Sequence, residues 1–344
     1  MRTALCERLG MDVPVIQAAM ADVACPALVA AVSNAGGLGM LQFGWLTPEV
    51  IREQISRTRA LTDRPFGAGF VLDRPQEERV EVALDAGMRI ISLFWGDPAP
   101  YVARVHDAGA LLMHAVGSVA EARQAAEAGV DIVIAQGWEA GGHVRGEVGT
   151  LALVPAVVDA VAPVLVVAAG GIADGRALAA VLALGASGGW IGTRFLMAAE
   201  ANIHTDYQAA LVRATANDTF VAALFDVGWE DAPGRALRNS TARAWEAAGR
   251  PPRGQRPGEG ETLYHSPTQG RGTRYEPLVA PMDAQGDVEA SSLWAGQGVG
   301  LVSRRQPAGA IIREIVEQAH DVFAHLARIA AFEPEAEARG ATRF

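Results

Sequence analysis

Short apolar runs and segments with helical periodicity alternate along the first two-thirds of the chain. The apolar runs have the length and composition of buried strands, and they lie at 13–18, 39–42, 66–72, 90–95, 111–116, 131–136, 164–169 and 190–193. Helical segments separate them at 24–34, 47–60, 76–86, 98–108, 118–129, 151–161 and 174–185. The pattern predicts eight strand–helix units, with the last helix drawn from residues 195–214 or from the C-terminus.

This alternation predicts an α/β fold of the (β/α)8, or TIM barrel, type. Strands that alternate with helices of ten to fifteen residues form parallel sheets. Eight units over roughly 200 residues fit a closed barrel better than an open sheet. An open doubly wound sheet is the alternative, and it has less support because no G-x-G-x-x-G motif follows the first strand.

Several predicted helices carry end signals in the sequence. Thr47-Pro48 places an N-cap residue before a proline at the first helical position. Ser118 with Glu121 has the spacing of a capping box, and Gly129 is a suitable C-terminal stop. Asp174 is a predicted N-cap of the helix that ends at Gly185.

The sequence changes in character after about residue 215. Residues 216–245 still have a helical pattern with Trp229 and Trp245, whereas 249–260 is too rich in proline and glycine for a helix or strand and is expected to be an exposed loop. A smaller, partly helical second domain over the barrel mouth follows from this change. The predicted division is a TIM barrel at 1–215, a lid or substrate region at 216–290, and a return segment at 291–344.

The return segment contains a predicted long helix at 308–331. Its apolar positions, among them Ile311, Ile312, Ile315 and Val322, have the spacing of a core-facing stripe. We expect this helix to pack on the barrel and to close it.

Composition narrows the class of protein. The 344 residues carry a formal net charge of −10, which argues against a nucleic-acid or anionic-membrane partner. The two cysteines, Cys6 and Cys25, are too few for a disulfide framework and fit a reducing compartment. Charged residues interrupt the start of the chain, and no uncharged apolar stretch reaches the ~18 residues of a membrane span. We therefore expect a soluble cytoplasmic protein.

Three loops at predicted strand ends carry candidate chemistry. The loop after 131–136 holds several glycines, including Gly142, around His143, an imidazole that can exchange protons near neutral pH. The loops after the seventh and eighth strands contain Gly170-Gly171 and Gly192-Thr193, where TIM barrels often bind phosphate. Each loop alone could be a turn or a close-packing site. Together they favour a phosphate-bearing cofactor at the C-terminal end of the barrel.

Other residue patterns give weaker evidence about the site. Met20 ends the first strand on the same face, where a methionine is either core or a contact to a flat ring. His114, inside an apolar run, is either a pocket residue or a satisfied core histidine. No histidine and cysteine spacing suggests a metal site, and no serine or cysteine lies in a nucleophile elbow.

These motifs resemble those of the FMN-dependent nitronate monooxygenases, formerly called 2-nitropropane dioxygenases. The resemblance covers most of the chain but does not separate this family from FMN-dependent enoyl-ACP reductases and NAD(P)H:quinone reductases. The motifs that carry it are Ile16-Gln-Ala-Ala-Met20, Gly36-Gly-Leu-Gly39, Gln136-Gly-Trp-Glu-Ala-Gly-Gly-His143, Val166-Val-Ala-Ala-Gly-Gly-Ile-Ala-Asp-Gly-Arg176, Ala183-Leu-Gly-Ala with Gly192-Thr-Arg-Phe-Leu196, and Ala295-Gly-Gln297.

The resemblance implies an FMN-binding TIM barrel with a lid-like domain. It makes His143 the catalytic histidine beside the flavin. It implies phosphate contacts from Gly171, Gly192 and Thr193, and places Ala18 and Met20 beside the isoalloxazine. The full set expected at the cofactor is Ala18, Met20, His114, Gln136, Gly142, Gly170, Gly171, Gly192, Thr193 and Gln297.

The chain departs from the family pattern at four places. Ala19 replaces a proline in the first motif, and Gly69 replaces an asparagine on the third strand. His114 stands where the fifth strand often has a glutamine. A Glu-Ser pair common after the eighth strand is Glu200-Ala201 here. The first three departures lie near the expected flavin, so they bear on the substrate range.

The expected activity is oxidation of alkyl nitronates at bound FMN with O2 as the oxidant. His143 would bind the nitro oxygens when protonated, or take the α-proton of a nitroalkane when neutral. Trp138, Phe195 and Trp294 are candidates for an apolar wall.

Two other functions stay open. An FMN reductase could use NAD(P)H to reduce a quinone or an enoyl thioester, with Arg145, Arg194 and the arginines at 250–256 available for a phosphate. The second alternative is a barrel that binds flavin but catalyses no reaction. A homodimer is left open as the assembly.

Overall fold

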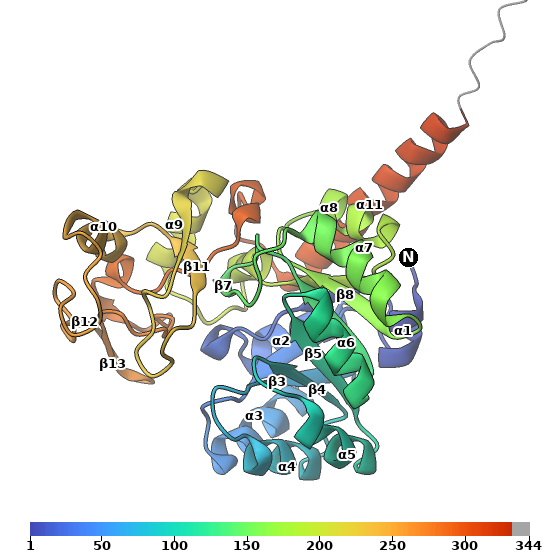
Figure 1. The fold of residues 1–344 in the computed structure, drawn as a ribbon, viewed down its shortest axis with the longest axis horizontal. Helices are drawn as coiled ribbons and strands as arrows, with labels where there is room; N and C mark the ends of the chain where they lie inside the picture. The colour runs from blue at the N-terminus through green and yellow to red at the C-terminus, as the bar shows by residue number, and fades with distance from the viewer. Residues whose placement is uncertain (332–344) are drawn as a thin grey trace, which may run out of the picture.

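The computed structural model describes residues 1–331 and contains a closed barrel of eight parallel strands (Figure 1). The strands follow one another around the barrel in chain order. They are β1 (Val15–Gln17), β2 (Gly39–Gln42), β3 (Phe66–Val71), β4 (Ile90–Phe94), β5 (Leu111–Val116), β6 (Ile132–Gln136), β8 (Leu165–Ala169) and β9 (Gly188–Ile191). The predicted TIM barrel is confirmed, and each predicted strand is present to within three residues at either end.

Helices cover the outside of this barrel. They are α2 (Pro26–Asn34), α3 (Pro48–Arg59), α4 (Glu77–Asp85), α5 (Ala99–Asp107), α6 (Val119–Ala128), α7 (Thr150–Val161), α8 (Gly175–Ala183) and α11 (Ala308–Ala330). The eighth helix is α11, which packs against both α8 and α2. The C-terminal choice for the last helix is therefore the correct one, and the segment 195–214 does not fill that place.

The predicted helix ends are present. Pro48 occupies the first turn of α3 after Thr47, and Asp174 accepts hydrogen bonds from the N–H groups of the first turn of α8. Ser118 accepts the Glu121 N–H at 3.2 Å. The Glu121 carboxylate accepts the N–H of Gly117 at 2.8 Å instead of that of Ser118, so only half of the predicted capping box forms.

A side chain completes the seam between β1 and β2. These two strands are joined by a bridge between Ile16 and Leu38. Gln17 is fully buried there, and its Oε1 accepts the Met40 N–H at 3.2 Å while its Nε2 donates to the Met40 carbonyl at 3.3 Å. A buried amide must find such partners. The backbone contributes two further hydrogen bonds, from the Gln17 N–H to the Leu38 carbonyl and from the Leu38 N–H to the Val15 carbonyl. The Gln17 side chain thus extends this ladder and helps to close the barrel.

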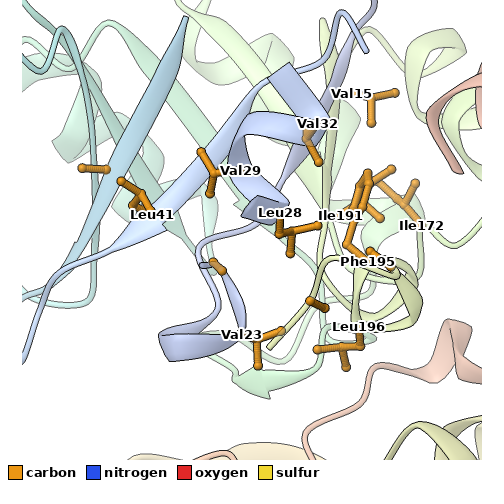
Figure 2. Packing of buried hydrophobic residues seen from close by; sticks show 14 of the residues in the cluster. Val15, Val23, Leu28, Val29, Val32, Leu41, Ile172, Ile191, Phe195 and Leu196 are labelled. Atoms are coloured by element: carbon orange, nitrogen blue, oxygen red, sulfur yellow. The ribbon is translucent and has the colours of Figure 1, made fainter. Parts of the chain in front are cut away.

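Side-chain alternation along the strands separates two apolar layers. Inward-facing residues such as Met40, Ile134 and Val167 form a core inside the barrel, which α1 (Ala4–Leu9) extends with Leu5 and Leu9. Outward-facing strand residues such as Val15 and Ile191 pack in one cluster with Leu28 and Val32 of α2, as Figure 2 shows. Each such fully buried aliphatic side chain contributes about 1.5–3 kcal/mol of hydrophobic free energy.

A second region lies to one side of the barrel mouth (Figure 1). It contains two small antiparallel sheets, β10–β11–β7 and β13–β12–β14. Its elements are α9 (Thr205–Arg213), β10 (Thr219–Ala222), β11 (Gly234–Leu237), α10 (Ser240–Ala247), β12 (Thr262–Ser266), β13 (Gly270–Thr273) and β14 (Gln285–Gly286). The boundaries at 215 and 290 stay a prediction.

The helical pattern expected at 216–245 is wrong over most of that range. A strand at Thr219–Ala222 pairs with another at Gly234–Leu237, and only Ser240–Ala247 is helical. The β-branched and aromatic residues of 219–221 favour a strand once a partner strand is available. Within residues 1–331, no helix is long and apolar enough to span a membrane.

Candidate active site

A cavity of about 470 Å³ opens at the C-terminal end of the barrel strands, the position of the active site in TIM barrels. Its floor comes from the barrel, and the second region supplies Trp229, Leu278 and Trp294 on the other side. Its volume lies in the range of ligand sites. Predicted site residues that line it are Ala18, Met20, Gln136, Gly142, His143, Gly170, Gly171, Gly192 and Thr193.

One end of the cavity presents unused backbone donors. Gly170 and Gly171 have φ values of +99° and +73°, a conformation that glycine adopts without strain. Among the described residues, the N–H groups of Gly171, Ile172, Gly192 and Thr193 donate to no protein group. Converging N–H groups without a partner form an anion site. This end of the cavity therefore fits a phosphate.

The N-terminus of α8, which follows the Gly170-Gly171 loop, does not contribute donors to this site. Asp174 Oδ1 accepts the N–H groups of Arg176 and Ala177, and Gln318 Oε1 accepts that of Gly175 at 3.0 Å. The first turn of the helix is thus already satisfied by protein groups. The donors available to an anion come from the glycine loops and not from the helix itself.

His143 lies inside a group of tryptophans. Its ring centroid is 4.0 Å from that of Trp229, 5.1 Å from that of Trp294 and 6.4 Å from that of Trp95. Its Nδ1 lies 3.2 Å from the carbonyl oxygen of Ala232. Because a carbonyl only accepts, Nδ1 carries the hydrogen and Nε2 keeps a lone pair.

This environment fixes the charge of the imidazole. Burial lowers the pKa of His143 to about 4, although hydrogen bonds to the backbone of Ala232 and Pro233 and the charge of Asp73 act to raise it. A protonated ring would be a buried cation, which desolvation disfavours. At neutral pH His143 is therefore a neutral base, and the protonated form that could pair with an anion is scarcely populated.

The loop that carries His143 is tied down at both ends. Gln136 Nε2 donates to the His143 carbonyl at 3.0 Å, and its Oε1 accepts the Arg145 N–H at 2.9 Å. Glu139 Oε2 accepts both the N–H and the hydroxyl of Thr150, at 2.8 and 2.9 Å. β7 (Gly142–His143) then pairs with β11. The histidine is thus positioned jointly by the barrel and the second region.

Ala19 and Gly69, two of the positions that depart from the family pattern, lie next to each other. A Cβ added to Gly69 would lie 2.7 Å from the Ala19 Cβ and 2.5 Å from Gln42 Oε1. Gln42 faces Gly69 in the strand register and lines the cavity. A larger residue at 69 requires its neighbours to move. Gln42 places a side-chain amide next to position 69 from the neighbouring strand.

The structure places several predicted residues away from the cavity. His114 is buried in the outer layer with Leu112 and Val116, because strand alternation turns its neighbour Ala115 inward instead. Burial lowers its pKa to about 4. Gln297 does not line the cavity, and its N–H donates to the Glu139 carbonyl at 2.9 Å.

Two of the three residues proposed for the apolar wall also lie elsewhere. Phe195 is fully buried in the core behind the site, and Trp138 stacks on Arg235 outside the main cavity. Trp294 does line it. The rest of the wall comes from Trp45, Phe94 and Trp229, which carried no recognisable motif in the sequence.

The arginines considered as phosphate-binding residues of a reductase do not line the cavity either. Each lies against a carboxylate: Arg145 with Glu121, Arg194 with Glu314, Arg250 with Glu246, Arg253 with Glu230, and Arg256 with Asp226. Arg256 is buried, so the loop at 249–260 is not exposed throughout. Arg74, which lies outside the motifs described above, does line the cavity.

Fold and site together define a TIM-barrel enzyme with its site at the carboxyl ends of the strands. Comparison with known families specifies the class. The sequence model described as "Nitronate monooxygenase" matches residues 2–79 and 72–318. The chain therefore belongs to the nitronate monooxygenase family, and the protein is a flavin-dependent oxidoreductase that acts on small molecules.

Individual relatives carry different names. A nitronate monooxygenase of Paraburkholderia phytofirmans is 33% identical over 91% of this chain and 94% of its own. A Mycobacterium tuberculosis protein named "(3aS,4S,5R,7aS)-5-hydroxy-7a-methyl-1-oxo-octahydro-1H-indene-4-carboxyl-CoA dehydrogenase" is 37% identical over 73% of this chain and 70% of its own. Among solved structures, FabK from Thermotoga maritima has a TM-score of 0.79 at 31% identity, covering 96% of this chain and 99% of its own.

Proposed function

We propose that the protein oxidises alkyl nitronates and nitroalkanes with FMN as its cofactor and O2 as the final oxidant. The observation that carries the proposal is a neutral histidine with a free Nε2 lone pair in a cavity that also presents a site for a cofactor phosphate. A nitroalkane requires a base for its α-proton, and the flavin requires backbone donors for its phosphate.

The described residues fit FMN. The unused N–H groups of Gly171, Ile172, Gly192 and Thr193 would hold its single terminal phosphate. Ala18 and Met20 lie beside Gly192 and would contact the ring. Bound FMN would supply the two-electron redox chemistry that no side chain provides.

His143 would act on the neutral nitroalkane. Its Nε2 lone pair can accept the α-proton, while Nδ1 stays bonded to the Ala232 carbonyl and keeps the tautomer fixed. The indole rings of Trp229 and Trp294 lie against the imidazole and give the base an apolar environment. A preformed nitronate has already lost this proton, so it would not depend on His143 in the same way.

A reductase is the second candidate, and the size and lining of the cavity favour it. The mouth is broad and apolar, with Trp45, Leu46, Phe94 and Leu278 among its lining residues. Such a wall can accept an acyl chain or a ring system larger than a small nitronate. A relative named as a CoA dehydrogenase and the likeness to FabK agree with this alternative.

Anaerobic flavin reduction distinguishes these functions. We expect propyl nitronate to bleach the flavin band of the holoprotein faster than NADPH does, because the described chain has no dedicated dinucleotide-binding turn. The measurement is stopped-flow absorbance with each reductant alone. Fast bleaching by micromolar NADPH with nitronate inert would assign the protein to the reductases. No bleaching by either would favour a flavin-binding barrel without turnover.

The pKa of His143 predicts the acid limb of the pH profile. The base is active when neutral, so kcat/KM for a neutral nitroalkane should stay near its plateau as the pH falls and decline only near pH 4. At pH 5.5 a histidine with a pKa of 6.5 would be about 90% protonated, whereas one at 4 would be about 3% protonated. A limb centred near 6.5 would contradict the neutral-base assignment.

A further inference from the structure

Charged side chains are few in the main cavity. Among its lining residues in the described part of the chain, Arg74 is the one cation, and Asp22 and Glu276 are the two carboxylates. His143 adds no charge at neutral pH because burial lowers its pKa. An anionic substrate therefore meets one positive side chain in this cavity.

Arg74 is held with one edge of its guanidinium group free. Its Nε and Nη2 donate to the same oxygen, Asp73 Oδ2, at 3.1 and 2.9 Å. Nη1 donates to no group within residues 1–331, and one hydrogen of Nη2 is also left. These two nitrogens form the planar fork that binds two oxygens of one anion.

The loop that carries Arg74 is well anchored. The Asp73 side chain is 2% exposed, and its second oxygen is buried without a partner in the described chain. Gln76 is fully buried, and its Nε2 donates to the carbonyls of Val71 and Gly44 at 2.7 and 3.0 Å. Asp73 and Gln76 thus fix the backbone on both sides of Arg74. The guanidinium is oriented before any ligand arrives.

The topology separates Arg74 from the phosphate end of the cavity. Arg74 follows β3, and the glycine loops follow β8 and β9. In the closed ring of eight strands, β3 lies four strands from β8 in either direction. Arg74 is therefore on the opposite side of the mouth from the donors that fit the FMN phosphate, and a second ligand is available to it.

We propose that Arg74, oriented by Asp73, binds the anionic head of the substrate, a planar group with two oxygens such as a nitronate or a carboxylate. The proposal deepens the nitronate function and rests on it for the identity of the head group. In this arrangement His143 accepts the α-proton, and Arg74 binds the negatively charged nitronate group that results.

The two carboxylates around the cavity favour Arg74 as the position of the anion. Asp22 accepts the Gln269 amide at 2.7 Å, and Glu276 accepts the Thr273 N–H at 2.7 Å. Both are acceptors and would repel a nitronate. Val71, at the end of β3, packs with Trp229, whose ring centroid lies 4.0 Å from that of His143. The loop that carries Arg74 therefore begins in the part of the site that holds the base.

The test measures binding of matched charged and neutral probes to the FMN holoprotein by calorimetry. Hexanoate shares the planar two-oxygen head of a nitronate, and hexanamide has nearly the same shape without the charge. For Arg74→Gln we expect hexanoate affinity to fall about ten- to hundredfold, the effect of losing a charged hydrogen bond. Hexanamide affinity should change less than threefold. Arg74→Lys should restore part of the loss.

Controls separate a binding role from a structural one. Arg104→Gln removes an arginine that is exposed to a similar degree and paired with Glu81 far from the cavity, and it should leave both probes unchanged. Equal losses for hexanoate and hexanamide in Arg74→Gln, or no binding of hexanoate to the wild type, would overturn the proposal. Because hexanoate is not turned over, a protein that binds it through Arg74 but fails to oxidise nitronate refutes the proposed activity alone.

Discussion

His143→Ala should lower kcat/KM for a neutral nitroalkane by about 10²–10⁴-fold, the contribution of a positioned general base. The same variant should lose much less activity with preformed nitronate, which has no proton left to remove. Flavin content should stay near one per chain, because the groups that fit the phosphate are backbone N–H groups of other loops. Steady-state kinetics with the two substrates and the flavin-to-protein absorbance ratio check this result.

His114→Ala is the matched control. His114 is also a buried histidine with a pKa lowered to about 4, but its side chain lies outside the cavity. Its removal should leave kcat/KM within a few fold. A loss below tenfold with nitroalkane in the His143 variant, or equal losses with both substrates, would reduce His143 to a structural residue.

Gly171→Val should yield folded protein that lacks flavin. The added Cβ would first meet the Glu139 Cβ at 3.5 Å, an ordinary contact, so the fold has room for it. The side chain would nevertheless occupy the surface where a phosphate must approach the backbone, and the φ of +73° adds strain of roughly 1–3 kcal/mol. The measurement is FMN retained after gel filtration, together with the melting temperature of the apoprotein.

Gly109→Val separates the backbone strain from the loss of space for the phosphate. Gly109 has a φ of +66° and open space around its Cβ position, after the end of α5 and away from the cavity. This variant should show a similar fall in stability while retaining its flavin. Stoichiometric FMN in Gly171→Val would show that the phosphate is not bound at this loop.

The sequence was most informative where local chemistry determines local structure. Most elements of the barrel were predicted from the hydrophobic periodicity, the length of the apolar runs and the capping residues Thr47, Ser118 and Asp174. Buried parallel strands and capped helices are specified by neighbouring residues. The strands at 219–222 and 234–237 were missed for the opposite reason. Their hydrogen bonds depend on partners brought together by the fold, so the helical period of 216–245 was misleading.

The candidate site shows the same division. Gly171, Gly192 and His143 line the cavity, and the signal that pointed to them was a glycine loop after a strand. His114 and Gln297 do not line it, since a shift of one position along a strand or loop turns a side chain to the other face. Trp229 and Arg74 were missed because they reach the cavity through packing. An Asp-Arg-Pro stretch directly after a predicted strand was the available signal for Arg74.

The place of α11 in the barrel has a consequence for synthesis on the ribosome. The eight strands are complete at residue 191, but the helix that covers the gap between α8 and α2 begins at residue 308. A nascent chain therefore exposes the apolar surface that Ile311, Ile312 and Ile315 later bury, the kind of surface that promotes aggregation during folding. Thr193, in the loop proposed to bind the phosphate, accepts the Gly296 N–H through its Oγ1 at 3.0 Å, and Trp294 and Gly296 line the same cavity. The cavity is therefore complete only after nearly all of the polypeptide has emerged.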